Sequence, residues 1–125
     1  EAQFFDDEIV KVCNDLANRG VRVIVAGLDM DYKGNPFGPM PALMATAEYV
    51  TKVHAVCPRT GNLAHYSFRK SQSEDLVLLG ETEEYEPLSR AAYYKAVLRD
   101  KVKKMDVKDA EEISAAEVQQ SKKQA

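Results

Sequence analysis

Apolar residues recur at helical spacing over residues 6–19, and a short, almost continuous apolar run follows them at 21–27. The first pattern predicts an amphipathic helix that begins at an aspartate cap and ends at Gly20. The second run is rich in β-branched residues, which is typical of a strand buried on both faces of a parallel sheet. A helix followed by such a strand predicts an α/β layer.

The segment 28–39 is dense in turn-forming residues, but it also carries Met30, Tyr32 and Phe37. A solvated linker does not need three large apolar side chains. Because ligands of α/β folds bind at the carboxyl ends of strands, we expect this loop to line a binding site. Residues 41–48 then predict a short helix, with a proline tolerated in its first turn.

The middle of the chain has the pattern of a β-ribbon. Two segments rich in β-branched and aromatic residues, 49–56 and 63–70, flank a turn cluster at 57–62 and predict a hairpin. The polar run at 71–75 predicts a mobile loop, and the apolar run at 76–80 predicts another short strand.

The C-terminal third changes character along its length. Pro87 predicts the start of a helix that continues to residue 104. From 105 to 125 the composition shifts to Lys, Asp, Glu, Gln, Ser and Ala. We expect this polar tail to be disordered or to form a frayed, solvated helix.

Composition narrows the class of protein. The 125 residues are 45% hydrophobic and 30% charged with a net charge of −3, which suits one compact domain and gives no electrostatic reason to bind nucleic acid. No apolar stretch approaches the roughly 20 residues that span a bilayer. Two cysteines, Cys13 and Cys57, do not suggest a disulfide scaffold, so we expect a cytoplasmic setting.

Several separate motifs carry a resemblance to one family. In their order and spacing they resemble the second half of the thymidine kinases of the zinc-ribbon type, and the likeness runs from Glu1 to about Tyr94. The motifs are Glu-Ala-Gln-Phe-Phe at 1–5, Val-Ile-Val-Ala-Gly-Leu-Asp at 23–29, Pro-Phe-Gly-Pro-Met-Pro at 36–41, Ala-Glu-Tyr-Val-Thr-Lys-Val at 47–53 and Glu-Thr-Glu-Glu-Tyr-Glu-Pro at 81–87.

The resemblance implies an α/β fold in four parts. Residues 1–48 correspond to the C-terminal part of a parallel-sheet P-loop kinase core. Residues 49–86 correspond to a small β-ribbon subdomain, zinc-ribbon-like, whose lasso loop binds thymidine. A helix over 87–104 and a polar tail over 105–125 complete the chain.

The family transfers the γ-phosphoryl group of ATP, with Mg²⁺, to the 5′-hydroxyl of thymidine. The resemblance implies that Glu1 accepts the proton of that hydroxyl, although a terminal glutamate beside aromatic residues would be a weak signal alone. It also assigns Phe4, Leu28, Tyr32 and Phe37 to the surroundings of the nucleoside, Ser67 to the thymine methyl, Leu78 and Tyr85 to the lasso, and Arg69 to nucleoside or phosphate contacts.

The zinc site of the family is not preserved. Most members hold a structural zinc with two pairs of cysteines. Here only Cys57 remains, and Thr60, Ser89 and Ala92 stand at the other three positions. The nearby histidines do not restore a set of four ligands, so we predict that the protein binds no zinc.

No G-x-x-x-x-G-K-[ST] phosphate loop occurs in the chain, and the aspartate that the family places just before the base is also missing. Because the chain starts at Glu1 without a methionine or signal peptide, we expect a cut end. We also expect that these residues alone do not use MgATP.

Two interpretations stay open. One is the substrate-binding half of a thymidine kinase, and the other is a non-catalytic nucleoside-binding or interaction module. The resemblance further implies a cytoplasmic homotetramer of nucleoside salvage for DNA synthesis, inhibited by thymidine triphosphate.

Overall fold

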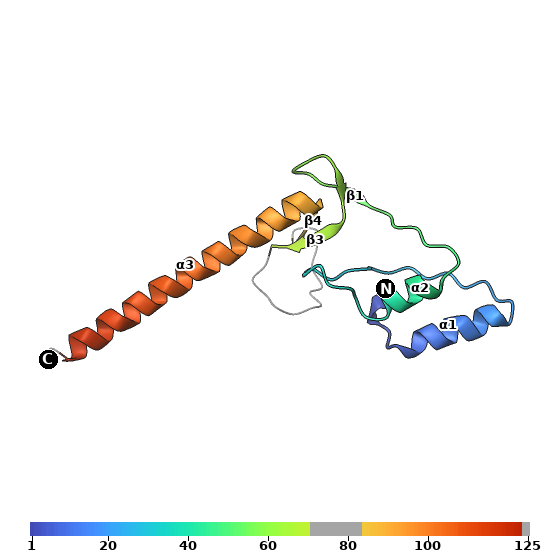
Figure 1. Cartoon of the computed structure of the whole chain (residues 1–125), viewed down its shortest axis with the longest axis horizontal. Helices are drawn as coiled ribbons and strands as arrows, with labels where there is room; N and C mark the ends of the chain where they lie inside the picture. Colours follow the sequence, from blue (N-terminus) through green and yellow to red (C-terminus); the bar gives the residue numbers. More distant parts are fainter. Residues whose placement is uncertain (71–83, 124–125) are drawn as a thin grey trace. The chain divides into compact units, whose positions relative to one another are not determined.

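The computed structural model describes residues 1–70 and 84–123. The chain divides into two compact units, Glu1–Ser89 and Arg90–Ala125. The first holds short helices and two small antiparallel sheets, and the second is built on one helix (Figure 1). The described residues therefore form a mixed fold of helices and antiparallel strands.

The N-terminal elements form a small helical core. A short 3₁₀ turn, η1 (Ala2–Phe4), precedes α1 (Glu8–Asn18), and α2 (Met40–Thr46) lies beside α1 (Figure 1). Both helices were predicted, and both are confirmed. The core consists of the buried Ala2, Met40 and Leu43, against which Ile9, Val10 and Cys13 pack.

The ends of α1 follow from local chemistry. The side chain of Asp6 accepts a hydrogen bond from the backbone N–H of Glu8 at 3.0 Å. This bond satisfies one of the backbone N–H groups that have no partner within the first turn of a helix. Gly20 has φ +83°, the left-handed conformation that commonly ends helices.

Residues 21–27 form no strand, which corrects the prediction of a strand buried on both faces. Ile24 is 80% exposed. A strand needs a hydrogen-bonded neighbour, and within residues 1–70 and 84–123 no strand pairs with this segment. Instead, the carbonyl of Ala26 accepts from the N–H of Ala2 at 3.0 Å and from the amino group of Glu1 at 3.1 Å.

The loop after residue 28 is a compact turn. The carboxylate of Asp31 accepts from the N–H groups of Lys33 and Asn35 at 2.9 and 3.0 Å, the pattern of an Asx-type turn. The N–H of Phe37 then donates to the carbonyl of Asp29 at 3.0 Å. These bonds fold the loop back on itself and fix where its aromatic side chains emerge.

The ribbon contains the predicted hairpin in a shorter form. Strand β1 (Ala55–Val56) pairs with β2 (Leu63–Ala64), while the earlier part of the predicted strand, 49–54, is irregular. A second pair joins β3 (Tyr66–Arg69) to β4 (Tyr85–Leu88). The predicted loop at 71–75, the predicted strand at 76–80 and Leu78 lie outside the described residues.

Strand β4 was not predicted, because Pro87 was expected to begin a helix. Pro87 instead lies opposite Ser67 in a two-stranded sheet, where an edge position tolerates the missing N–H. Helix α3 (Arg90–Lys123) begins three residues later.

Helix α3 is continuous for 34 residues, so the helix does not end at 104 as predicted. The segment 105–123, predicted to be disordered or a frayed, solvated helix, is helical, and residues 101–120 are exposed. In the part of the chain that the structure describes, no helix combines the length and apolarity that crossing a membrane requires.

Candidate functional site

The first five residues are tied to the segment that precedes the turn-rich loop. Besides the bonds to Ala26, the side-chain oxygen of Gln3 accepts from the N–H of Leu28 at 3.0 Å. The rings of Phe4 and Phe37 meet edge to face, with centroids 5.6 Å apart. Four of the predicted site residues are therefore brought into one neighbourhood: Glu1, Phe4, Leu28 and Phe37.

Glu1 itself is exposed and precedes η1, and its side chain makes no capping hydrogen bond. Its carboxylate is therefore not committed to supporting the turn that follows. An accessible carboxylate at the rim of an aromatic cluster can accept a proton from a hydroxyl that is held beside it.

Gln3 is a residue that the sequence reasoning missed. It is only 4% exposed, and two glycines allow the chain to pass close to it. A Cβ on Gly27 would lie 2.8 Å from the Gln3 side-chain oxygen, and a Cβ on Gly38, where φ is +51°, would collide with the Gln3 carbonyl oxygen. The available signal was this pair of glycines in segments otherwise rich in large residues.

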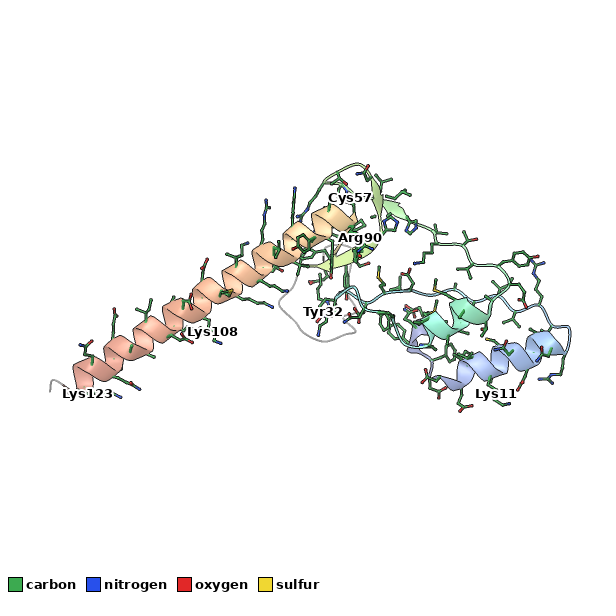
Figure 2. The ribbon with its side chains drawn as sticks, viewed as in Figure 1. Lys11, Tyr32, Cys57, Arg90, Lys108 and Lys123 are labelled. Carbon is green, nitrogen blue, oxygen red and sulfur yellow. The ribbon has the colours of Figure 1, made fainter. Side chains whose placement is uncertain are left out.

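A second group of predicted site residues meets around Arg69 at the end of β3. The guanidinium carbon of Arg69 lies 3.7 Å from the centroid of the Tyr32 ring, and its Nη2 donates to the hydroxyl of Tyr85 at 2.9 Å. Tyr85 is the cross-strand partner of Arg69. Figure 2 shows Tyr32 projecting from its loop toward the ribbon.

Ser67 belongs to the same face of β3 as Arg69, because alternate residues of a strand point to the same side. Ser67 is exposed and Arg69 is buried. The described part of the structure thus brings together eight of the nine predicted site residues in two adjoining groups. The loop that carries Tyr32 and Phe37 joins the two groups. The ninth residue, Leu78, lies outside the described residues.

The other face of the ribbon carries a separate ion pair. Arg59 donates to both carboxylate oxygens of Glu86 at 2.9 and 2.8 Å, and its guanidinium lies 5.9 Å from the Phe68 ring centroid. The hydrogen bonds from Arg59 lower the pKa of Glu86. This pair joins the turn of the hairpin to β4.

Asp29, at the start of the turn-rich loop, forms an ion pair with Lys52, with Nζ and Oδ2 2.8 Å apart. Partial burial raises the pKa of Asp29, but the hydrogen bond and charge of Lys52, with nearby backbone N–H groups, outweigh burial and lower it. This contact was not predicted, because the two residues come from segments that were predicted to be separate.

Cys57 lies in the hairpin turn, fully buried, at the place labelled in Figure 2. The hydroxyl of Thr60 donates to the hydroxyl of Ser89 at 3.0 Å, and both residues hydrogen-bond to the Cys57 sulfur. Burial raises the pKa of the Cys57 thiol, but these hydrogen bonds outweigh burial and lower it from 9.0 to about 6.

These three residues do not fit a zinc ion. Protein zinc sites use thiolate, imidazole or carboxylate ligands, whereas two of the groups here are hydroxyls already bonded to each other. Within residues 1–70 and 84–123 no three His, Cys, Asp or Glu side chains are grouped to hold a metal. Ala92, at the remaining position, has no ligand atom.

We therefore expect a strong chelator to leave the thermal unfolding temperature of the full-length protein unchanged, and metal analysis to find zinc far below one ion per chain. Stoichiometric zinc in the unmodified protein would contradict the prediction.

Comparison with known proteins gives a consistent result. The family model described as thymidine kinase matches residues 1–93. The chain is 59% identical over 103 residues to a thymidine kinase of Bacteroides fragilis, covering 82% of this chain and 52% of that protein. It is 62% identical over 96 residues to a thymidine kinase of Bacteroides thetaiotaomicron, covering 77% and 48%.

A thymidine kinase of Porphyromonas gingivalis is 59% identical over 95 residues, covering 76% of this chain and 47% of the relative. The chain thus spans about half the length of the curated relatives it matches.

Proposed function

Because the chain belongs to the thymidine kinase family, we propose that the full-length protein transfers the γ-phosphoryl group of ATP to the 5′-hydroxyl of thymidine. The observation that carries the proposal is the convergence of residues 1–5, residues 28–37, and Arg69 with Tyr85 on two adjoining aromatic groups. Flat aromatic and apolar walls with a few fixed polar groups suit a nucleoside.

The proposal gives each residue a role. Glu1 accepts the proton of the 5′-hydroxyl as that oxygen attacks the γ-phosphorus and ADP leaves. Tyr85 and Ser67, with Leu78, contact the thymine base. Phe4, Leu28, Tyr32 and Phe37 surround the nucleoside and exclude water from the reacting oxygen.

We also propose where ATP binds, which involves parts of the full-length protein outside residues 1–125. ATP with Mg²⁺ would bind to a phosphate loop elsewhere in the full-length protein, and residues 21–27 would pack beside the parallel sheet of that kinase core. The exposure of Ile24 and Val25 supports this, since such apolar side chains are normally covered. A cytoplasmic homotetramer inhibited by thymidine triphosphate belongs to the same proposal.

A phosphorylation assay of the full-length protein with labelled ATP and thymidine tests the function. Formation of thymidine monophosphate, with guanosine giving none, is the expected result. Binding of thymidine without any transfer would favour the alternative, a non-catalytic nucleoside-binding module. Absence of both binding and transfer would reject either form.

Replacing Tyr85 by alanine is expected to weaken thymidine binding about 10- to 100-fold, because it removes a ring and a hydroxyl from the proposed base contact. Calorimetric titration of the full-length variant with thymidine measures the effect. Tyr94→Ala is a suitable control, because Tyr94 is an exposed tyrosine of α3 outside the proposed site. Unaltered affinity in Tyr85→Ala would count against the assignment.

A further inference from the structure

Arg69 is the most deeply buried charged side chain among the proposed site residues, with 4% of its surface exposed. Its guanidinium is engaged in two ways. One face stacks on Tyr32 at 3.7 Å from the ring centroid, and Nη2 donates to the Tyr85 hydroxyl at 2.9 Å. The same group also lies 5.4 Å from the Tyr85 ring centroid.

These contacts join two segments that are distant in sequence. Tyr32 comes from the loop held by the Asp31 turn, and Tyr85 begins β4. The guanidinium contacts both tyrosines. The guanidinium of Arg69 therefore bridges the two tyrosines.

A planar cation is required for this arrangement. A guanidinium can stack on a ring with its face while its edge donates hydrogen bonds, whereas an ammonium is a compact, strongly hydrated point charge that cannot do both. Lysine at this position would keep the charge and lose the stack. The geometry is thus specific to arginine.

We propose that Arg69 is a positioning residue of the nucleoside site, which holds Tyr32 and Tyr85 at a fixed separation and does not itself bind a phosphate group. The proposal rests on the proposed function, because it assigns those two tyrosines to nucleoside binding. It replaces the broader expectation that Arg69 makes nucleoside or phosphate contacts.

The donor role of Arg69 also orients the Tyr85 hydroxyl. Because the phenol oxygen accepts from a cationic N–H, its own hydrogen must point toward an acceptor other than Arg69. A charged donor polarises the hydroxyl and makes it a stronger donor in turn. Arg69 therefore fixes which polar character Tyr85 presents, as well as where its ring lies.

The full-length protein with Arg69→Lys is the test, and Arg59→Lys is its matched control. Both arginines lie in the ribbon and contact aromatic rings, but Arg59 bonds to Glu86 on the opposite face. We expect Arg69→Lys to raise the KM for thymidine about tenfold. The KM for ATP should stay within about twofold in either variant, since a phosphate contact is what would change it.

A double-mutant cycle separates positioning from a general loss of structure. Tyr85→Phe removes the hydroxyl that Arg69 bonds, so adding Arg69→Lys to Tyr85→Phe is expected to raise the thymidine KM less than it does in the wild type. Unfolding temperatures of all variants are measured alongside. An unchanged thymidine KM in Arg69→Lys, strictly additive effects in the cycle, an equal rise in KM for ATP, or an equal effect of Arg59→Lys would each overturn the positioning role.

The activity of the wild type distinguishes failure of the proposed kinase function from failure of the positioning role of Arg69. A wild type that phosphorylates thymidine, combined with an unchanged thymidine KM in Arg69→Lys, overturns the positioning role alone. A wild type that neither binds nor phosphorylates thymidine overturns the proposed function and the positioning role with it.

Discussion

Replacing Glu1 by glutamine in the full-length protein is expected to lower kcat for thymidine by about 100- to 10,000-fold, the usual contribution of a general base. The amide keeps the size of the side chain and removes only its ability to accept the proton of the 5′-hydroxyl. The turn that follows should be undisturbed, because the Glu1 side chain makes no capping bond.

The affinity for thymidine is expected to stay within a few-fold, because a proton acceptor is lost and a binding contact is not. Steady-state kcat and a calorimetric Kd measure the two quantities independently. Glu8→Gln is the control, since Glu8 is an exposed glutamate in the first turn of α1 and lies outside the proposed site. An unchanged kcat in Glu1→Gln would reject the role of base.

Replacing Gly38 by alanine is expected to lower the free energy of unfolding by about 2–4 kcal/mol. Two costs add at this position. The backbone has φ +51°, which a residue with a Cβ adopts poorly, and that Cβ would collide with the backbone oxygen of Gln3, which is buried and cannot swing aside as a flexible side chain could.

Gly20→Ala provides the comparison, because Gly20 has φ +83° and open space where a Cβ would lie. This control carries the conformational cost alone, about 1–2 kcal/mol. Urea unfolding of the full-length proteins measures both values. Equal losses in the two variants would mean that the chain does not pass as close to Gln3 at Gly38 as the structure has it.

Helices α1 and α2 were predictable because their information is local. A stripe of apolar residues at helical spacing, an aspartate before it and a glycine after it suffice for α1, whichever elements surround it. The hairpin turn was predictable for the same reason, since its turn-forming residues are adjacent.

Strands were less predictable, because a strand is defined by its neighbour. Residues 21–27 have every local property of a buried strand, yet the described residues offer them no partner. Strand β4 is the opposite case: Pro87 argues against it locally, and pairing with β3 across 15 or more intervening residues nevertheless produces it.

The candidate site shows the same division. Glu1, Phe4 and Tyr85 were predicted as site residues from motifs that resemble a family, whereas the contacts between their segments could be described only from the folded chain. Gln3 escaped because a buried amide that supports a neighbouring backbone has no local signature. In the structure, the side chain of Gln3 accepts from the N–H of Leu28, and Gly27 and Gly38 pass close to Gln3.

The hydroxyl pair beside Cys57 also affects how the ribbon forms. Thr60 and Ser89 are separated by 29 positions, so their contact closes a long loop, at an entropic cost that rises slowly with loop length. A hydrogen bond contributes only about 1 kcal/mol toward that closure. We therefore expect the Thr60–Ser89 bond to form only once the pairing of β3 with β4 has brought these two residues close together, whereas the turn itself is closed by the local backbone bonds between Cys57 and Asn62 and between Gly61 and Cys57.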